Sequence, residues 1–200
     1  MKEVSSDPAA IPSPGDLPRD EGPTSFLGAE TPVSRQGRVV CDDLDMRIDR
    51  DGVWYYHGSA IRRKELVCLF ASVLTRDEDG RYWLVTPNEI GLVRVDDAPF
   101  IVVEMFNAGS GREKMISLRT NVDEIVTVND DHSLHVVTNP ETGEPSPYVR
   151  LREGIEARVA RSVYYELVAQ GVEEEIDGQL FFGVWSSGSF FALGRLEPET

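Results

Sequence analysis

The pair Asp51-Gly52 constrains the fold more than any other feature of this chain. It lies between two short runs of strand-forming residues, Met-Arg-Ile at 46–48 and Val-Trp-Tyr at 53–55. Because Asp-Gly tolerates the positive φ angles of a type I′ turn, this arrangement predicts a β-hairpin. The organising unit then continues through a helix to a returning strand at 82–86, Tyr-Trp-Leu-Val-Thr.

The predicted helix follows the hairpin after a break at Gly58-Ser59. Leu66, Leu69, Phe70 and Val73 recur at helical spacing and form one apolar face. Neighbouring apolar residues widen that face until little beyond the first turn is polar. A helix this apolar is expected to be buried against a sheet.

Successive strands are expected in the middle of the chain. The predicted segments are 91–95, 100–106, 114–119, 125–128 and 134–137. Strand 100–106 is apolar on both faces, which is typical of a central position. The short links favour antiparallel pairing, with 125–128 and 134–137 expected to pair with each other.

The C-terminal part repeats the plan of the opening unit in outline, and we interpret the likeness as a duplication. The expected elements are a strand at 148–152, a helix on which Ile155, Val159, Val163 and Leu167 recur at every fourth position, an acidic turn at 173–178, and strands at 180–185 and 190–193. The alignment sets Ile61 against Ile155 and the Asp-Gly pair at 79–80 against that at 177–178. We therefore predict an α+β fold of duplicated strand–helix–strand units with antiparallel sheets.

Three segments divide the chain. Residues 1–37 hold six of the twelve prolines without hydrophobic periodicity, which predicts a flexible Pro-rich arm; docking through Phe26-Leu27 is the alternative. Residues 38–106 and 107–200 are the two predicted α+β repeats. The formal net charge is −15, of which −12 falls on residues 38–200. Because such a body repels phosphate backbones, nucleic acid is not an expected partner.

The cysteines and the hydropathy pattern indicate the cellular compartment to expect. Cys41 and Cys68 have neither metal-binding nor redox spacing, and Cys68 is expected in the core. No signal peptide opens the chain, and no apolar run reaches membrane-spanning length. A cytoplasmic protein without membrane insertion is expected.

Several short sequence blocks occur in a distinctive order. They include Asp-Met-Arg-Ile-Asp-Arg-Asp-Gly-Val-Trp at 45–54, Gly-Ser-Ala-Ile-Arg-Arg at 58–63, Pro-Tyr-Val at 147–149, Ile-Glu-Ala-Arg at 155–158 and Tyr-Tyr-Glu-Leu at 164–167. Over about residues 42–194 the chain resembles an uncharacterised bacterial family, domain of unknown function 1285. The resemblance implies a duplicated α+β core with a superficially pleckstrin-homology-like second half. It also implies a groove between the halves for a nucleotide-like ligand in signal transduction.

Arginines near the predicted strand-to-helix junctions are candidate anion ligands. They are Arg62, Arg63, Arg150, Arg152, Arg158 and Arg161. Guanidinium groups grip phosphate or carboxylate bidentately, and Arg63 and Arg158 are expected to face one groove. The alternative is pairing with nearby acids such as Glu65, Glu153, Glu156 and Glu166.

Aromatic and hydroxyl side chains complete the candidate site. Trp54, Tyr148 and Trp185 are candidates for stacking on a flat ligand, with a core role as the alternative. Ser186, in Ser-Ser-Gly at 186–188, is a candidate anion contact or part of a hairpin turn. The spacing of Asp130-Asp131-His132 and His135 fits metal ligation poorly, so no metal, cofactor or catalytic residue is predicted.

The leading functional hypothesis is a non-catalytic ligand-binding or regulatory module for a nucleotide-like anion. The second is a protein-interaction module that uses a sheet edge or the arm. The third is an enzyme on a nucleotide-like substrate. A stabilising ligand, turnover of that ligand, or neither separates the three.

Overall fold

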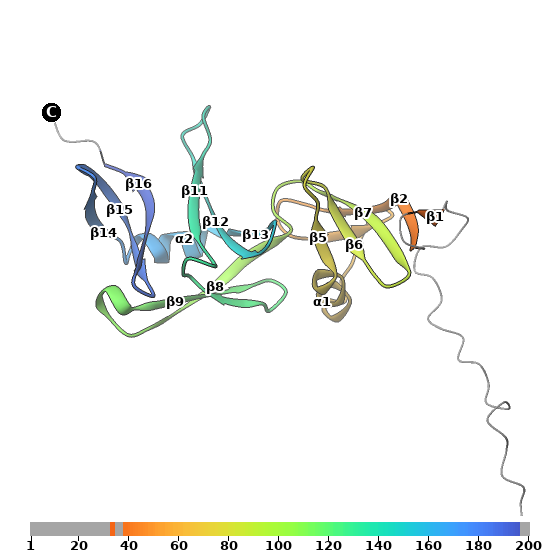
Figure 1. The fold of residues 1–200 in the computed structure, drawn as a ribbon, viewed down its shortest axis with the longest axis horizontal. Helices are drawn as coiled ribbons and strands as arrows, with labels where there is room; N and C mark the ends of the chain where they lie inside the picture. The colour runs from red at the N-terminus through yellow and green to blue at the C-terminus, as the bar shows by residue number, and fades with distance from the viewer. Residues whose placement is uncertain (1–32, 35–37, 197–200) are drawn as a thin grey trace, which may run out of the picture. The chain divides into compact units, whose positions relative to one another are not determined.

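Strands make up most of the fold (Figure 1). The computed structural model describes residues 33–34 and 38–196, in which three sheets and two α-helices follow one another. The predicted arm, residues 1–37, lies almost wholly outside the described residues. The described residues belong to one compact unit.

The first sheet contains seven strands. They are β1 (Val33–Ser34), β2 (Arg38–Ile48), β3 (Trp54–Tyr56), β4 (Ser59–Ala60), β5 (Leu74–Arg76), β6 (Tyr82–Val85) and β7 (Glu89–Val95). The strand order is β4-β3-β2-β7-β6-β5, and β1 pairs with β2. Strand β2 runs parallel to the last strand β7, and every other neighbouring pair is antiparallel.

The second sheet repeats this plan with six strands. They are β8 (Phe100–Ala108), β9 (Met115–Thr120), β10 (Ile125–Thr127), β11 (Leu134–Thr138), β12 (Pro145–Arg152) and β13 (Ile155–Val159), with a 3₁₀ turn η2 (Gly111–Glu113) between β8 and β9. The order is β10-β9-β8-β13-β12-β11, and β8 runs parallel to β13. Each half is thus two three-stranded meanders joined through a parallel central pair. The duplicated α+β architecture is confirmed at this level.

A smaller unit ends the described chain. Helix α2 (Arg161–Val168) leads into a three-stranded antiparallel sheet of β14 (Val172–Ile176), β15 (Gln179–Ser186) and β16 (Ser189–Arg195). Residues 173–176, expected in a turn, therefore belong to a strand, and only Asp177-Gly178 forms the turn. The pleckstrin-homology likeness of the second half stays a prediction.

The sequence-based alignment of the repeats is wrong in register. Ile155 begins strand β13, the counterpart of β7, and does not begin a helix. Residues 155–159 alternate between buried and half-buried, which is the period of a strand, and only Val163 and Leu167 lie buried on α2. The apolar spacing of four fits either structure over so short a run.

The expected pairing of 125–128 with 134–137 is also wrong. Strand β10 pairs with β9, and β11 pairs with β12. The turn at 121–124 closes the first hairpin, so Asn129–Asp131 connects two separate meanders. Each strand thus pairs with a strand of its own meander and not across that link.

Helix α1 (Lys64–Ser72) forms where it was predicted but is not a buried helix. Ala71 is its one buried residue, and Leu69 is 54% exposed. Phe70 is half-buried and stacks on Trp54, with 6.2 Å between ring centroids. The sheet covers only one face of the helix. The apolar residues extend further around the helix than that face, so several of them stay partly or largely exposed.

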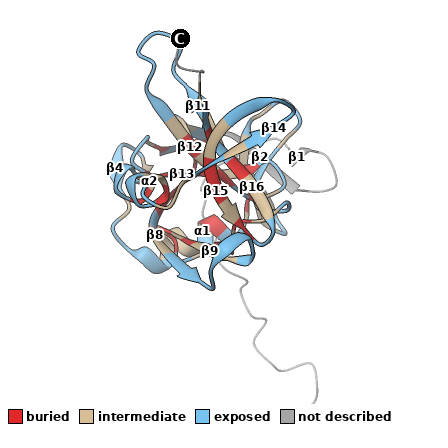
Figure 2. Ribbon diagram, turned by 90° about the vertical axis from the view of Figure 1, so that its left-hand side faces the viewer, coloured by how far each residue is buried: buried red, intermediate tan, exposed pale blue. Residues whose placement is uncertain are grey.

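The buried core draws residues from all three sheets and from both helices (red in Figure 2). Its largest fully buried side chains include Trp54, Phe100, Ile48, Leu74, Ile116, Leu118, Ile155 and Leu167. The members come from both duplicated halves and from α2. Hairpin ends are mostly exposed (Figure 2).

Candidate functional site

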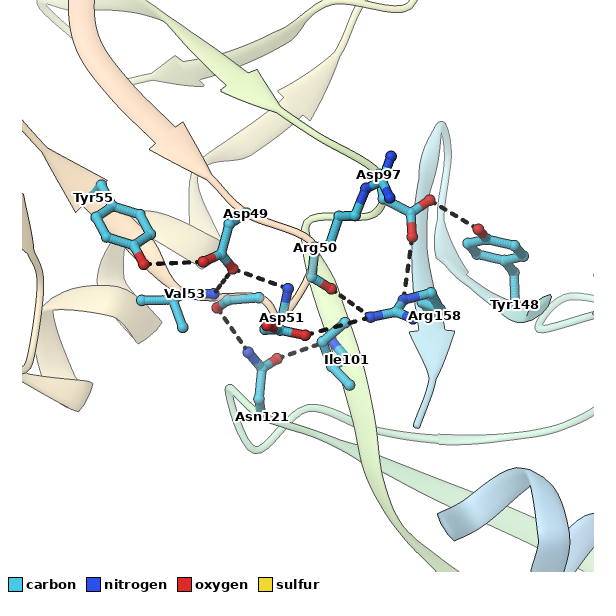
Figure 3. Close-up of polar contacts among 11 residues, drawn as sticks. Asp49, Arg50, Asp51, Val53, Tyr55, Asp97, Ile101, Asn121, Tyr148 and Arg158 are labelled. Atoms are coloured by element: carbon cyan, nitrogen blue, oxygen red, sulfur yellow. Dashed lines mark hydrogen bonds and ion pairs between the residues drawn. The ribbon is translucent and has the colours of Figure 1, made fainter. Parts of the chain in front are cut away.

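The loop between β2 and β3 is held in one shape by Asp49. Its carboxylate accepts hydrogen bonds from the backbone N–H groups of Asp51 and Val53, both at 2.9 Å, and from the Tyr55 hydroxyl at 3.0 Å (Figure 3). The predicted hairpin is confirmed, but its loop has three residues and only Gly52 has a positive φ, 72°. A type I turn followed by a left-handed glycine therefore replaces the expected type I′ turn.

Asn121 of the second half contacts this loop. Its Nδ2 donates to the Gly52 carbonyl at 3.2 Å, and its Oδ1 accepts from the Ile101 N–H at 3.1 Å (Figure 3). A Cβ atom on Gly52 would lie 2.8 Å from Asn121 Nδ2 and 2.8 Å from Ile101 Cγ1. The close approach of the two halves, together with the positive φ, requires glycine here.

Arg158 of β13 contacts the same loop from another side. Its Nη2 donates to the Arg50 carbonyl at 2.5 Å, and its Nε lies 3.2 Å from Asp97 Oδ2 (Figure 3). Asp97 in turn accepts a 2.8 Å hydrogen bond from the Tyr148 hydroxyl. Partial burial, followed by this hydrogen bond to Asp97, raises the pKa of Tyr148 to about 12. Tyr148 therefore remains a neutral donor at physiological pH.

A pocket of about 690 Å³ opens beside this network. It is lined from the β2–β3 loop, the β7–β8 link, the β11–β12 hairpin and the start of α2. The lining residues with charged or aromatic side chains are Arg50, Asp96, Asp97, Glu144, Tyr148, Arg158, Arg161, Tyr164 and Tyr165. Three predicted site residues, Tyr148, Arg158 and Arg161, thus come together here.

Some of the charged side chains in the pocket form ion pairs and others do not. Asp96 forms an ion pair with Arg47 at 2.5 Å, and the hydrogen bond from Arg47 lowers the pKa of Asp96. Arg161 donates from Nε to the Tyr165 hydroxyl at 2.8 Å. Among the described residues, neither Arg161 nor Arg50 has an ion-pair partner. The pocket therefore offers two guanidinium groups to an anion.

The other candidate arginines lie elsewhere. Arg62 and Arg63 are exposed beside the first turn of α1 and do not line the pocket. Arg152 pairs with Glu124 at 3.0 Å and donates to the Ala71 carbonyl at 2.7 Å, so it ties α1 to the second sheet. Arg150 donates to the Asp131 carbonyl at 3.0 Å. Arg63 and Arg158 were expected to face one groove, but Arg63 does not line the pocket of Arg158, where Arg50 and Arg161 lie instead.

Trp54, Ser186 and Trp185 also lie outside the pocket. Trp54 is 1% exposed in the core, and Ser186 is buried, donating to the Val128 carbonyl at 2.7 Å and accepting from the Ile116 N–H at 3.0 Å. Trp185 lies under the Arg112 guanidinium, 4.4 Å from ring centroid to Cζ. Trp54 thus has the position of the core alternative, Trp185 is half-buried, and Ser186 precedes the turn at Ser187-Gly188.

Sequence reasoning missed Arg50, the Asp96-Asp97 pair and the tyrosines of α2 as pocket residues. Asp96-Asp97 falls in the link between the expected strands 91–95 and 100–106, and Tyr-Tyr at 164–165 belongs only to a block of the resemblance. The signal that was available is the concentration of charge in loops next to central strands, where functional side chains commonly lie.

The described part of the chain lacks two further features. It contains no group of three or more His, Cys, Asp or Glu side chains placed to hold a metal ion. His132 Nδ1 lies 3.1 Å from the Arg150 carbonyl, and the His135 ring stacks on Tyr148 at 5.7 Å. Neither α1 nor α2 has the length and apolar character needed to cross a membrane.

Both halves of the chain match models of one protein family. Residues 31–98 match the model described as "Domain of unknown function (DUF1285), N-terminal domain", and residues 99–193 match "Protein of unknown function (DUF1285), C-terminal domain". The chain belongs to the DUF1285 family. The resemblance noted in the sequence is thereby confirmed. The models divide the chain just before β8, whereas the expected boundary between residues 106 and 107 falls within that strand.

Two solved structures of DUF1285 proteins are similar to this chain. The crystal structure from Silicibacter pomeroyi DSS-3 shares 42% sequence identity with a TM-score of 0.73, covering 86% of this chain and 92% of that one. The crystal structure from Shewanella baltica OS155 shares 26% identity with a TM-score of 0.49, covering 62% of this chain and 90% of that one. No curated protein matches the sequence.

Proposed function

We propose that this DUF1285 chain is a non-catalytic, cytoplasmic binding module for a nucleotide-like anion that acts in signal transduction. The ligand binds in the pocket beside Arg158, with its anionic group between Arg50 and Arg161. The observation that carries the proposal is that two arginines of one pocket have no ion-pair partner in the described chain, although the protein is strongly acidic. Glu144 and Asp96 act on Arg161 and Arg50 through longer-range electrostatics, but neither carboxylate forms an ion pair with them. Guanidinium groups not engaged in ion pairs are suited to bind phosphate.

Two further features support an anion with a flat ring. Helix α2 begins at this pocket without a side-chain cap, so the N–H groups of its first turn are available to an anion. Tyr148, Tyr164 and Tyr165 line the same pocket, and tyrosine rings stack on planar ligands.

The ionisable groups of the pocket favour binding over catalysis. Asp96 and Asp97 are engaged by Arg47 and Arg158, and the pKa of Tyr148 is raised to about 12. A carboxyl group with a lowered pKa, as in Asp96, and a phenol with a raised pKa, as in Tyr148, are poorly matched to proton transfer near neutral pH. They instead fix the shape and charge of the pocket.

A thermal-shift screen of nucleotides and phosphorylated metabolites tests the proposal. A ligand at 100 times its Kd stabilises the folded state by about 2.7 kcal/mol, which raises the Tm by several degrees. Arg161→Ala and Arg50→Ala should abolish that shift while leaving the Tm of the ligand-free protein nearly unchanged. Arg62→Ala, an exposed arginine outside the pocket, is the matched control and should retain the shift.

Three results would contradict the proposal. A shift that survives both pocket substitutions would mean that the anion binds elsewhere. Loss of the shift in Arg62→Ala as well would indicate general attraction to arginine. Turnover of the stabilising compound would identify an enzyme instead of a binding module.

A further inference from the structure

Strand β14 is the outer strand of the C-terminal sheet, which has the order β14-β15-β16 (Figure 1). Within the described residues, its other edge pairs with no strand. The remaining edge strands are shorter or covered: β1 and β4 have two residues each, β5 and β10 have three each, and the longer edge strands β11 and β16 lie against each other. A five-residue strand with one unpaired edge is a template for a further strand.

The hydrogen-bonding direction of β14 can be worked out from its neighbours. Glu175 lies opposite Leu180 of β15, and the Leu180 carbonyl accepts from the Leu196 N–H at 2.9 Å on the far side of β15. Leu180 therefore directs its backbone groups away from β14. Since antiparallel pairs alternate, the N–H and C=O groups of Glu173 and Glu175 point outward from the sheet edge.

The side chains of β14 define what a partner strand must carry. Val172 and Ile176 are 45% and 40% exposed at the two ends, and three glutamates lie between them. Glu174 pairs with Arg112 at 2.9 Å, whereas Glu173 and Glu175 are exposed and have no ion-pair partner in the described chain. An added strand gains most from apolar ends and a basic centre.

A second copy of this chain does not fit that edge. Antiparallel self-pairing about Glu174 would set Glu174 opposite itself and Glu173 opposite Glu175. Like charges directly opposite each other destabilise a sheet, so this edge discourages self-association.

We propose that β14 binds an extended basic segment of a partner protein by strand addition. The backbone of Glu173 and Glu175 pairs with the segment, their carboxylates meet its lysine or arginine side chains, and Val172 and Ile176 meet its apolar ends. The site does not involve the pocket at Arg158 and stands independently of the proposed ligand.

A palindromic peptide tests both strand orientations at once. The probe is fluorescein-labelled Thr-Val-Lys-Lys-Lys-Val-Thr, titrated with the full chain at low and high salt by fluorescence polarisation. The same peptide with N-methyl groups on all three lysine amides keeps its charge but loses its backbone donors. We expect the methylated peptide to bind at least about tenfold more weakly, because backbone pairing supplies the geometry of strand addition.

Two variants locate the site. Glu175→Pro removes an outward N–H but no hydrogen bond to β15, and should weaken binding at least about tenfold. Glu173→Gln with Glu175→Gln should weaken it about tenfold and reduce its salt dependence. The control, Glu141→Gln with Glu153→Gln, makes the same change in net charge at exposed acids outside β14 and should leave the affinity within about twofold.

The proposal is overturned if the full chain does not bind the unmodified peptide at low salt. It is also overturned if the methylated peptide binds equally well, since that result indicates general attraction to an acidic protein. Equal effects of the two glutamine pairs would have the same meaning. The peptide comparison uses the unaltered protein, so it decides the question even if Glu175→Pro fails to fold.

Discussion

Substitution of Gly52 by alanine should test how strongly the two halves depend on their contact at the β2–β3 loop. An alanine at φ 72° costs about 1 kcal/mol in backbone strain. Its Cβ would also lie 2.8 Å from Asn121 Nδ2 and from Ile101 Cγ1, so the Asn121 amide must move. Loss of its bonds to Gly52 and Ile101 adds about 1 kcal/mol each. The total is about 3 kcal/mol of unfolding free energy.

Gly58 provides a matched control, because its φ is also 72° and a Cβ there would meet nothing within 4 Å. Gly58→Ala should therefore cost only the backbone strain, about 1 kcal/mol. Urea denaturation followed by tryptophan fluorescence measures both values. If the two variants lose the same free energy, the contact between Asn121 and the loop contributes nothing and the reasoning is wrong. In an Asn121→Ala background, the extra cost of Gly52→Ala should shrink.

Two further predictions concern single side chains. The folded-state pKa of Tyr148 is raised above its ordinary value of 10.0, so its contribution to stability is complete below pH 10 and falls as the pH rises toward 12. Urea midpoints between pH 9 and 11 should therefore fall less in Tyr148→Phe than in the parent protein, and equal slopes would contradict this account. Because Phe70 is half-buried, Phe70→Ala should cost about 2 kcal/mol in the same assay, below the usual range for a fully buried phenylalanine. A loss above about 4 kcal/mol would show that α1 is packed far more tightly than its exposure indicates.

The elements that sequence reasoning located best are those set by local chemistry. The hairpin at Asp51-Gly52, helix α1 and strands such as β7 and β15 depend on turn residues and spacing within a short window. Residues 155–159 were misjudged because five residues with apolar positions four apart suit a strand and a helix equally. The strand form is fixed by pairing with β12 on one side and with β8, which lies far away in the sequence, on the other.

The candidate site was predictable only in part for the same reason. Arg158 and Arg161 were selected by charge and by the resemblance, and Tyr148 by its aromatic ring. Arg50 and Asp97 become their neighbours only after β2 pairs with β7 and β8 pairs with β13. No local sequence pattern predicts such long-range strand pairing. Conversely, Trp54 and Ser186 carry the right chemistry but are directed into the core.

The parallel pair at the centre of each half has a consequence for how the chain is made. In each half, the two strands of the parallel pair are far apart in the sequence, so the earlier strand can pair only after the later one has formed. Met46 of β2 pairs with Val93 of β7, and Phe100 of β8 pairs with Ala157 of β13. Such long-range closures are slow and expose unpaired strands meanwhile. On the ribosome the first half can close before the second has been synthesised. The second half then emerges beside a finished neighbour, whose β2–β3 loop already presents the carbonyls that Asn121 and Arg158 will bind.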